Sequence, residues 1–366
     1  MSLTAGIIGL PNVGKSTLFN AITKAGAEVA NYPFATIKPN VGTVAVPDPR
    51  LKRIQQIIPA KKVTPTTFEF TDIAGIVKGA SHGEGLGNKF LENIRQTDAI
   101  VHVVRAFDDS NITSVSGKVD PIADIKTINV ELAIADLDSV NKRLGKVQRA
   151  AKGSNKDAKK ELAVLKKIKP VLENGGEVRS IPFNKDEKKI VKGEFLLTAK
   201  PVIYVANISE KYMADPSKSK YFQEVKKYAQ EHHAQALGIA CKAEQDIAAL
   251  GTKDQMAFLK TEGVKEPGLN KLIRASYRLL GLQTFFTAGG KETRAWTYMK
   301  GTKAPQAAGK VHSDMERGFI RAEIIHYADL DKYGSEDKVK DAGKLEVEGK
   351  DYVMHDGDIA YFRFNV

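Results

Sequence analysis

The chain has 366 residues, a hydrophobic content of 42% and one cysteine, Cys241. One cysteine excludes an intrachain disulfide and is typical of the reducing cytoplasm, and no apolar run approaches the roughly 20 residues of a membrane helix. The formal net charge of +12 favours a polyanionic partner, nucleic acid first.

A glycine-rich motif follows the first predicted strand. Residues 9–17 read GLPNVGKST and match G-x-x-x-x-G-K-[ST], the phosphate loop of P-loop nucleotidases. The apolar run 4–8 predicts a buried strand before it, and residues 17–24 predict an amphipathic helix after it. A chance strand–turn–helix is the weaker alternative. The residues expected to bind nucleotide are Asn12, Val13, Gly14, Lys15, Ser16 and Thr17.

The residue types in this loop suit phosphate and Mg²⁺. Glycines let the backbone curl so that successive N–H groups face phosphate oxygens. We expect Lys15 to reach the β- and γ-phosphates and the Ser16 hydroxyl to hold Mg²⁺. The chain runs directly into this motif without a basic n-region, so we expect no signal peptide.

Two further groups for the metal and the γ-phosphate follow in chain order. Thr36, in an irregular loop, is a candidate second ligand for Mg²⁺. The alternating run 66–71 predicts a strand that ends at Asp72-Ile-Ala-Gly75, a D-x-x-G motif. We expect Asp72 to hold Mg²⁺ and the Gly75 N–H to contact the γ-phosphate.

The next loop has the composition of a switch. Residues 79–87 contain four glycines and one histidine, His82. A catalytic role for His82 is a weak hypothesis, because a histidine in such a loop is more often simply solvated. The apolar run 99–104 then predicts a central parallel strand, and we interpret His102 within it as a core histidine.

The base-binding region comes much later in the chain. Residues 201–206 predict a buried strand, and Asn207-Ile208-Ser209-Glu210 stand where GTPases carry the base-reading N-K-x-D. Residues 237–244 resemble the last strand and its base-adjacent loop, which contains Cys241. A redox role for Cys241 is conceivable, although a lone cysteine there is more often inert.

Between the two halves of this domain lies a basic segment. Residues 141–196 carry 16 Lys and Arg against 7 Asp and Glu. Apolar residues at helical spacing occur on both sides of a polar turn at 152–156, which predicts a helical hairpin resembling a coiled coil. The charge either binds nucleic acid or forms a solvated face. Beyond 278 the chain becomes aromatic and β-rich, which predicts a small mixed α/β module.

With these motifs the chain resembles the YchF family, the Obg-like ATPases within the translation-factor-related P-loop GTPases. The resemblance covers essentially the full length. It rests on specific strings at 9–17, 31–42, 72–81, 83–91, 207–210, 282–297 and 304–323. It implies an α/β fold with a parallel-rich P-loop G domain (1–130 and 198–277), an inserted helical domain (131–197) and a C-terminal mixed α/β TGS domain (278–366).

The base motif departs from that of ordinary GTPases. The lysine of N-K-x-D is Ile208 here, and the aspartate that accepts two hydrogen bonds from guanine is Glu210, one methylene longer. Adenine offers a 6-amino donor instead, and we expect Asn207 or nearby backbone carbonyls to accept from it while Ile208 packs on the base. Family members with this pattern accept ATP, so we expect ATP to bind better than GTP.

The hydrolytic residue also departs from the usual pattern. Ile76 replaces the glutamine that orients the attacking water in Ras-like enzymes, so the sequence predicts slow turnover. Three candidates remain for positioning the attacking water: a K⁺ ion held by Asn12, the loop 72–87, and a partner. Ser114 stands where many family members carry a histidine, so that histidine's role does not carry over.

Three functions follow from these features. The first is a slow Mg²⁺-dependent ATPase that works as a nucleotide-controlled switch and associates with the ribosome or RNA through its basic helical and TGS domains. The second is an RNA-binding module whose nucleotide site is mainly structural. The third, a small-molecule kinase, is disfavoured because D-x-x-G with a base motif is a switch layout. We expect a monomer that does not associate with membranes.

Overall fold

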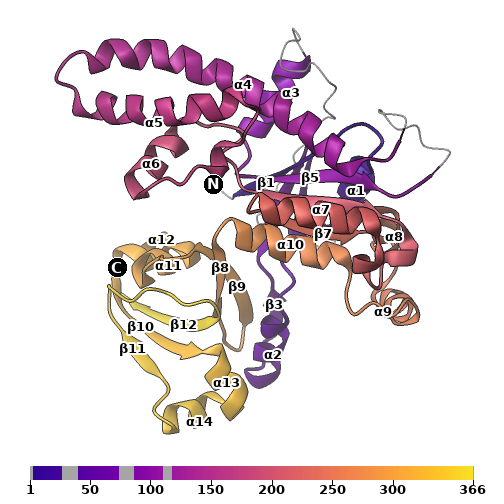
Figure 1. Cartoon of the computed structure of the whole chain (residues 1–366). Coiled ribbons are helices and arrows are strands. Elements are labelled where there is room, and N and C mark those ends of the chain that lie inside the picture. The colour runs from indigo at the N-terminus through magenta and orange to yellow at the C-terminus, as the bar shows by residue number, and fades with distance from the viewer. Residues whose placement is uncertain (1–2, 27–39, 74–85, 110–117, 366) are drawn as a thin grey trace. The chain divides into compact units, whose positions relative to one another are not determined.

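The computed structural model describes residues 3–26, 40–73, 86–109 and 118–365 (Figure 1). Among these residues the chain forms two compact units. The first unit takes residues up to 25, 40–42 and 69–272, and the second takes 43–68 and everything from 273 onward. No helix in the described ranges combines the length and apolar character needed to cross a bilayer.

The first unit is built on a largely parallel sheet. Its strands are β1 (Thr4–Ile8), β2 (Val41–Ala45), β4 (Thr67–Asp72), β5 (Ala99–Ala106), β6 (Val202–Ile208) and β7 (Gln235–Ile239). The strand order is β2-β4-β1-β5-β6-β7, and the pairs β1–β4, β1–β5, β5–β6 and β6–β7 are parallel. Every residue of β5 and β6 is buried, as continuous apolar runs in a covered parallel sheet require. The α/β architecture and the strands β1, β4, β5, β6 and β7 confirm the sequence prediction, whereas β2 was not predicted.

Helices connect the strands of this sheet. They are α1 (Lys15–Gly26), α3 (Leu86–Arg95), α7 (Lys220–Glu231), α8 (Cys241–Ile247), α9 (Thr252–Thr261) and α10 (Gly268–Leu279), with short 3₁₀ turns at Glu210–Tyr212 and Pro216–Lys218. The predicted apolar face of α1 is confirmed, since Leu18, Ala21 and Ile22 are all buried. Parallel connections bring the carboxyl ends of β1, β5 and β6 to one edge of the sheet, where ligands bind in such folds.

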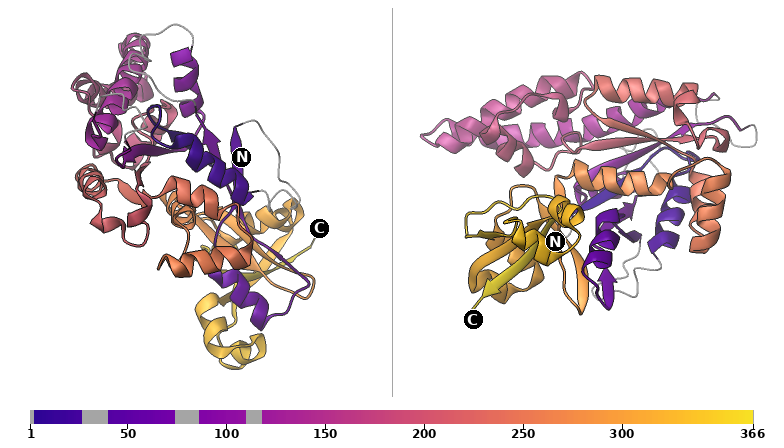
Figure 2. Two further views of the ribbon diagram at one scale, coloured as in Figure 1. Left: turned by 90° about the vertical axis from the view of Figure 1, so that its right-hand side faces the viewer. Right: turned by 90° about the horizontal axis from the view of Figure 1, so that it is seen from below.

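A helical hairpin is inserted in the chain between β5 and β6, which remain paired neighbours in the sheet. It consists of α4 (Pro121–Ala151), α5 (Lys156–Glu173), a 3₁₀ turn (Val178–Ser180) and α6 (Lys185–Gly193). Figures 1 and 2 show α4 and α5 side by side, and the segment has its own apolar core that includes Val140, Leu144 and Leu165. The predicted hairpin and its polar turn are confirmed. However, α4 begins at Pro121, before residue 131, because Asp120 caps it by accepting a hydrogen bond from the Ala123 N–H at 3.0 Å.

The second unit holds a mixed sheet. Its strands are β3 (Lys62–Thr64), β8 (Leu282–Thr287), β9 (Glu292–Met299), β10 (Phe319–His326), β11 (Glu346–Glu348) and β12 (Asp358–Phe364), in the order β11-β10-β12-β8-β9-β3. Its helices are α2 (Pro49–Ile57), α11 (Ala304–Val311), α12 (Ser313–Arg317), α13 (Tyr327–Tyr333) and α14 (Glu336–Asp341). The predicted C-terminal α/β module is therefore present, and it is larger than residues 278–366.

The additional part comes from the N-terminal third of the chain. Residues 43–68, which the sequence analysis assigned to the nucleotide domain, contribute α2 and β3 to the second unit. Strand β3 pairs in parallel with β9. Leu51 and Ile54 of α2 are buried in one core cluster with Phe286 and Leu330. Burial of this apolar face against residues of the second unit explains the assignment.

Candidate nucleotide-binding site

The loop between β1 and α1 has the backbone that a phosphate cradle needs. Asn12 and Gly14 both have positive φ, 63° and 96°. A Cβ on Gly9 would lie 2.6 Å from the Val103 carbonyl oxygen, and one on Gly14 would lie 2.2 Å from Asn207 Nδ2. Glycine is therefore required at both positions, as the motif predicts.

The structure brings together two residues that the sequence assigned to phosphate and metal. Lys15 Nζ lies 2.8 Å from Asp72 Oδ1, although the residues are far apart in sequence. Lys15 begins α1 and Asp72 ends β4, which lies beside β1. Ser16 follows Lys15 in the first turn of α1 and is exposed. An ammonium, a carboxylate and a hydroxyl at one sheet edge suit a phosphate chain with a hard cation such as Mg²⁺.

A cavity of about 870 Å³ extends from this loop to the predicted base-binding region. Its lining residues are Leu10, Pro11, Asn12, Gly14, Lys15, Ser16, Thr17, Phe107, Asp108, Asp109, Asn207, Ile208, Ser209, Glu210, Ala240 and Lys242. Eight of the fifteen site residues predicted from the sequence line this cavity together: Asn12, Gly14, Lys15, Ser16, Thr17, Asn207, Ile208 and Glu210. The volume is in the range of small-molecule sites.

Asn207 connects the two ends of the cavity. Its side-chain Nδ2 donates to the Val13 carbonyl oxygen at 2.9 Å, and its Oδ1 accepts from the Cys241 N–H at 3.1 Å. The residue is 7% exposed. The amide therefore holds the phosphate loop against the start of α8, which is a positioning task the sequence analysis did not assign to it.

Val13 and Cys241 lie behind the cavity wall. Val13 is 3% exposed and Cys241 is fully buried. Burial raises the pKa of the Cys241 thiol well above its usual value, which suppresses the thiolate that redox chemistry needs. The cavity is lined by the flanking residues Ala240 and Lys242, whereas Cys241 is not among its lining residues.

The sequence analysis missed a cavity wall formed by Phe107, Asp108 and Asp109. Arg105, at the end of β5, donates to the Phe107 carbonyl oxygen at 3.1 Å and to that of Asp109 at 2.9 Å. Its guanidinium lies over the Phe107 ring, 5.0 Å from the centroid. The Asp108 carboxylate accepts from the Tyr221 hydroxyl at 2.9 Å. The signal was present, because these residues follow a central parallel strand at its carboxyl end.

His102 is a core histidine, as predicted. It is 1% exposed on β5, and its ring lies 5.5 Å from that of Tyr204. Burial, together with the nearby Arg179 charge, lowers the pKa of His102 to about 3, so the ring is neutral at pH 7. Four predicted site residues, Thr36, Gly75, Ile76 and His82, lie outside the described residues, as does Ser114.

Two protein-family models match separate parts of the chain. Residues 4–142 match the family model MMR_HSR1, described as a 50S ribosome-binding GTPase. Residues 282–365 match the model YchF-GTPase_C, described as a protein of unknown function.

Full-length relatives are also found. The chain is 57% identical to "Ribosome-binding ATPase YchF" of Bacillus subtilis (strain 168) and 52% identical to that of Escherichia coli O157:H7, with all of each chain covered. The solved structure of the Schizosaccharomyces pombe YchF GTPase is 41% identical and has a TM-score of 0.89, covering 99% of this chain and 98% of that one. Together with the phosphate loop and the cavity geometry, these similarities show that the chain belongs to the YchF family.

Proposed function

We propose that this chain binds ATP with Mg²⁺ and hydrolyses it slowly, and that its nucleotide state controls association with the ribosome or RNA. The observation that carries the proposal is the 2.8 Å contact of Lys15 with Asp72 beside the 870 Å³ cavity. The relatives named ribosome-binding ATPases support the activity and the partner. We place the protein in the cytoplasm as a monomer.

The phosphate end of the cavity provides the charges for a nucleoside triphosphate. A bound Mg²⁺ would supply positive charge to the phosphate oxygens. Ser16 and Asp72 offer hard oxygen ligands that would hold such an ion, and Thr36 is the third candidate. The Lys15 ammonium, which pairs with Asp72 in the structure, would bind the phosphate oxygens. The Gly75 N–H is the proposed additional donor to the γ-phosphate.

The base end of the cavity favours adenine. Phe107 offers an aromatic face that Arg105 holds in place, and Ile208 lines the cavity beside it. Glu210 is exposed at the start of a 3₁₀ turn, one methylene longer than the aspartate that grips guanine. With no lysine in the motif to support it, Glu210 is a poor bidentate acceptor for guanine.

Turnover is expected to be slow. Ile76 can neither donate nor accept a hydrogen bond, so it cannot orient the attacking water as a glutamine does. His82 is a secondary candidate for this task. Asn12 lines the cavity with its backbone at φ 63°, and its amide oxygen is a suitable ligand for K⁺.

The path of the chain supports a switch. Residues 43–68 belong to the second unit, and both of their ends continue into β2 and β4 of the nucleotide sheet. Strand β4 ends at Asp72 itself. A change of backbone position at the γ-phosphate is therefore passed along β4 to a segment whose core lies in the second unit. In the proposed division, residues 131–197 and 278–366 are the helical and TGS domains that engage the partner.

The helical hairpin supplies charge for a polyanionic partner. Arg143 and Lys167 pair with Glu161 and Glu187. Within the described helices, Lys146, Lys159 and Lys166 are exposed and form no ion pair. Such side chains can release counterions from RNA phosphates.

Nucleotide binding by a Lys15→Ala variant tests the proposal, with Lys24→Ala as the matched control because Lys24 is an exposed lysine on the same helix. We expect Mg²⁺–ATP binding to be lost only in Lys15→Ala, and wild-type turnover to lie well below the typical enzyme value of about 10 s⁻¹. Fast turnover without a partner would contradict the switch. RNA affinity that falls steeply with salt and ignores nucleotide would favour the RNA-binding alternative instead.

A further inference from the structure

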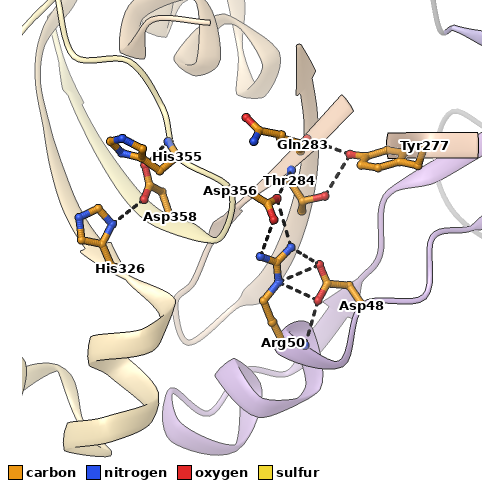
Figure 3. A network of polar contacts seen from close by, with 9 residues as sticks. All are labelled: Asp48, Arg50, Tyr277, Gln283, Thr284, His326, His355, Asp356 and Asp358. Carbon is orange, nitrogen blue, oxygen red and sulfur yellow. Dashed lines mark hydrogen bonds and ion pairs between the residues drawn. The ribbon is translucent and has the colours of Figure 1, made fainter. Parts of the chain in front are cut away.

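A cluster of imidazoles and carboxylates lies in the second unit, outside the nucleotide site. His326 ends β10, Asp358 begins β12, and His355 lies in the turn just before β12. One ligand atom from each lies within 4.8 Å of the others. Figure 3 shows both imidazole rings beside the Asp358 carboxylate. Asp358 is 1% exposed, whereas the rings reach the surface.

The two oxygens of Asp358 have different tasks. Oδ2 accepts from the His355 N–H at 2.8 Å and from the Tyr352 hydroxyl at 3.0 Å, which fixes the turn. Oδ1 lies 2.8 Å from His326 Nδ1. A carboxylate with one oxygen held by the protein and the other facing an imidazole is oriented as a monodentate metal ligand.

Two carboxylates face the His326 ring. Its Nδ1 lies 2.8 Å from Asp358 Oδ1, and its Nε2 lies 3.4 Å from Glu346 Oε2. Carboxylates on both sides of an imidazole make its surroundings attractive to a cation.

We propose that His326, His355 and Asp358 form a binding site for a divalent transition-metal ion of the Zn²⁺ class, with one ring nitrogen from each histidine and Asp358 Oδ1 as ligands. His326 would bind the ion through Nδ1, the nitrogen that faces Asp358, while its Nε2 faces the Glu346 carboxylate. This is the arrangement in which a carboxylate orients a metal-binding histidine. Imidazole and carboxylate ligands suit Zn²⁺, Cu²⁺ and Ni²⁺, and water completes the coordination.

The site needs only a small local movement to close. Ligand atoms bound to one Zn²⁺ at about 2.1 Å lie roughly 3.4 Å apart. His326 Nδ1 and Asp358 Oδ1, which lie 2.8 Å apart, would therefore separate slightly, while the His355 nitrogen, within 4.8 Å of both, would adjust its position. His355 is exposed and sits in a turn, so its ring can supply the movement. The Tyr352 hydroxyl, 2.9 Å from His355 Nδ1, supports this ring from behind. A bound ion would connect the ends of β10 and β12, and so stabilise the second unit.

The experiment uses the full chain without an affinity tag or nucleotide, after chelator treatment. Zn²⁺ is titrated in competition with a chromophoric chelator. We expect one ion per chain, at least tenfold weaker binding in His355→Ala and in His326→Ala, and a smaller loss in Glu346→Gln. His233→Asn is the matched control, because His233 is an exposed histidine with a positive φ of 52° that asparagine also adopts.

A second measurement separates the site from a folding defect. Zn²⁺ should raise the melting temperature of the wild type in a concentration-dependent way and leave that of His355→Ala unchanged. His355 is exposed, so its removal should not unfold the chain. Absence of a bound ion, equal affinity in the histidine variants, or an equal loss in His233→Asn would each overturn the proposal. None of these outcomes bears on ATP binding.

Discussion

Asn207→Ala should weaken ATP and GTP binding by similar factors. The amide makes one hydrogen bond to the phosphate loop, at Val13, and one to the start of α8, at Cys241. Both backbone partners belong to residues that are at most 3% exposed. Each buried group left without a partner costs about 1–3 kcal/mol, so the two together amount to about 2–6 kcal/mol.

This cost divides between folding and binding. Part of it appears as lower stability, because the two loops separate in the free protein. At least about 1.4 kcal/mol, a tenfold rise in Kd, should remain in nucleotide binding. The assay is a fluorescence titration with labelled ATP and GTP, and urea unfolding measures the stability component. Asn207→Asp keeps the acceptor for the Cys241 N–H but loses the donor to Val13 and adds a buried negative charge, so it should weaken binding of both nucleotides at least as much as Asn207→Ala.

Two results would refute this reasoning. Unchanged affinity for both nucleotides would mean that the bridge does not position the site. A large loss for ATP with little for GTP would mean that Asn207 reads the adenine 6-amino group directly, which is the role the sequence suggested.

Three further substitutions test the phosphate loop, the second unit and the buried histidine. Gly14→Ala should abolish nucleotide binding, because its Cβ would lie 2.2 Å from the Asn207 side-chain amide. Gly263 also has a positive φ, 67°, but its Cβ would meet open space, so Gly263→Ala should cost only about 1–3 kcal/mol of stability and leave binding intact. Equal nucleotide binding in the two variants would contradict this prediction. Arg50→Ala should lower the stability of the second unit by about 2–3 kcal/mol in urea unfolding, since this half-buried guanidinium pairs with the carboxylates of Asp48 and Asp356. Arg53→Ala, which breaks the exposed ion pair with Asp331, should cost at most about 1 kcal/mol. His102→Phe should reduce the loss of stability between pH 7 and pH 5.5 by about 1.3 kcal/mol. The pKa of His102 in the folded chain, about 3, lies below the usual 6.5, so the unfolded chain binds more protons as the pH falls through this window. An unchanged pH dependence of stability would count against a neutral buried ring.

The strands and the phosphate loop were predictable because their signals are local. A continuous apolar run predicts a buried parallel strand, and the glycine spacing around Lys15 specifies its loop. Residues 43–68 show where such reasoning ends. The sequence analysis predicted no element at α2, where Leu51 and Ile54 are buried, and their core cluster includes residues beyond 280. No local pattern contains that pairing.

The cavity wall shows the same limit within the site. Arg105 donates hydrogen bonds to the carbonyl oxygens of Phe107 and Asp109 and so fixes the turn that places Phe107 in the cavity wall. Predicting these bonds requires the direction of the Arg105 side chain, which the residue type alone does not give. Asn207 was identified as a site residue, yet its contacts with Val13 and Cys241 depend on three separate chain segments meeting. The motif gave the position, and the structure gives the contacts of its side chain.

A paired titration of the wild-type protein with labelled ATP and GTP, with Mg²⁺, in K⁺ and in Na⁺, tests the central claim most directly. We predict clearly tighter binding of ATP, because Ile208 and Glu210 replace the lysine and aspartate that grip guanine. Tighter binding of GTP would contradict the account. It would mean that Glu210 reads guanine despite the missing lysine and that the chain acts as an ordinary translational GTPase.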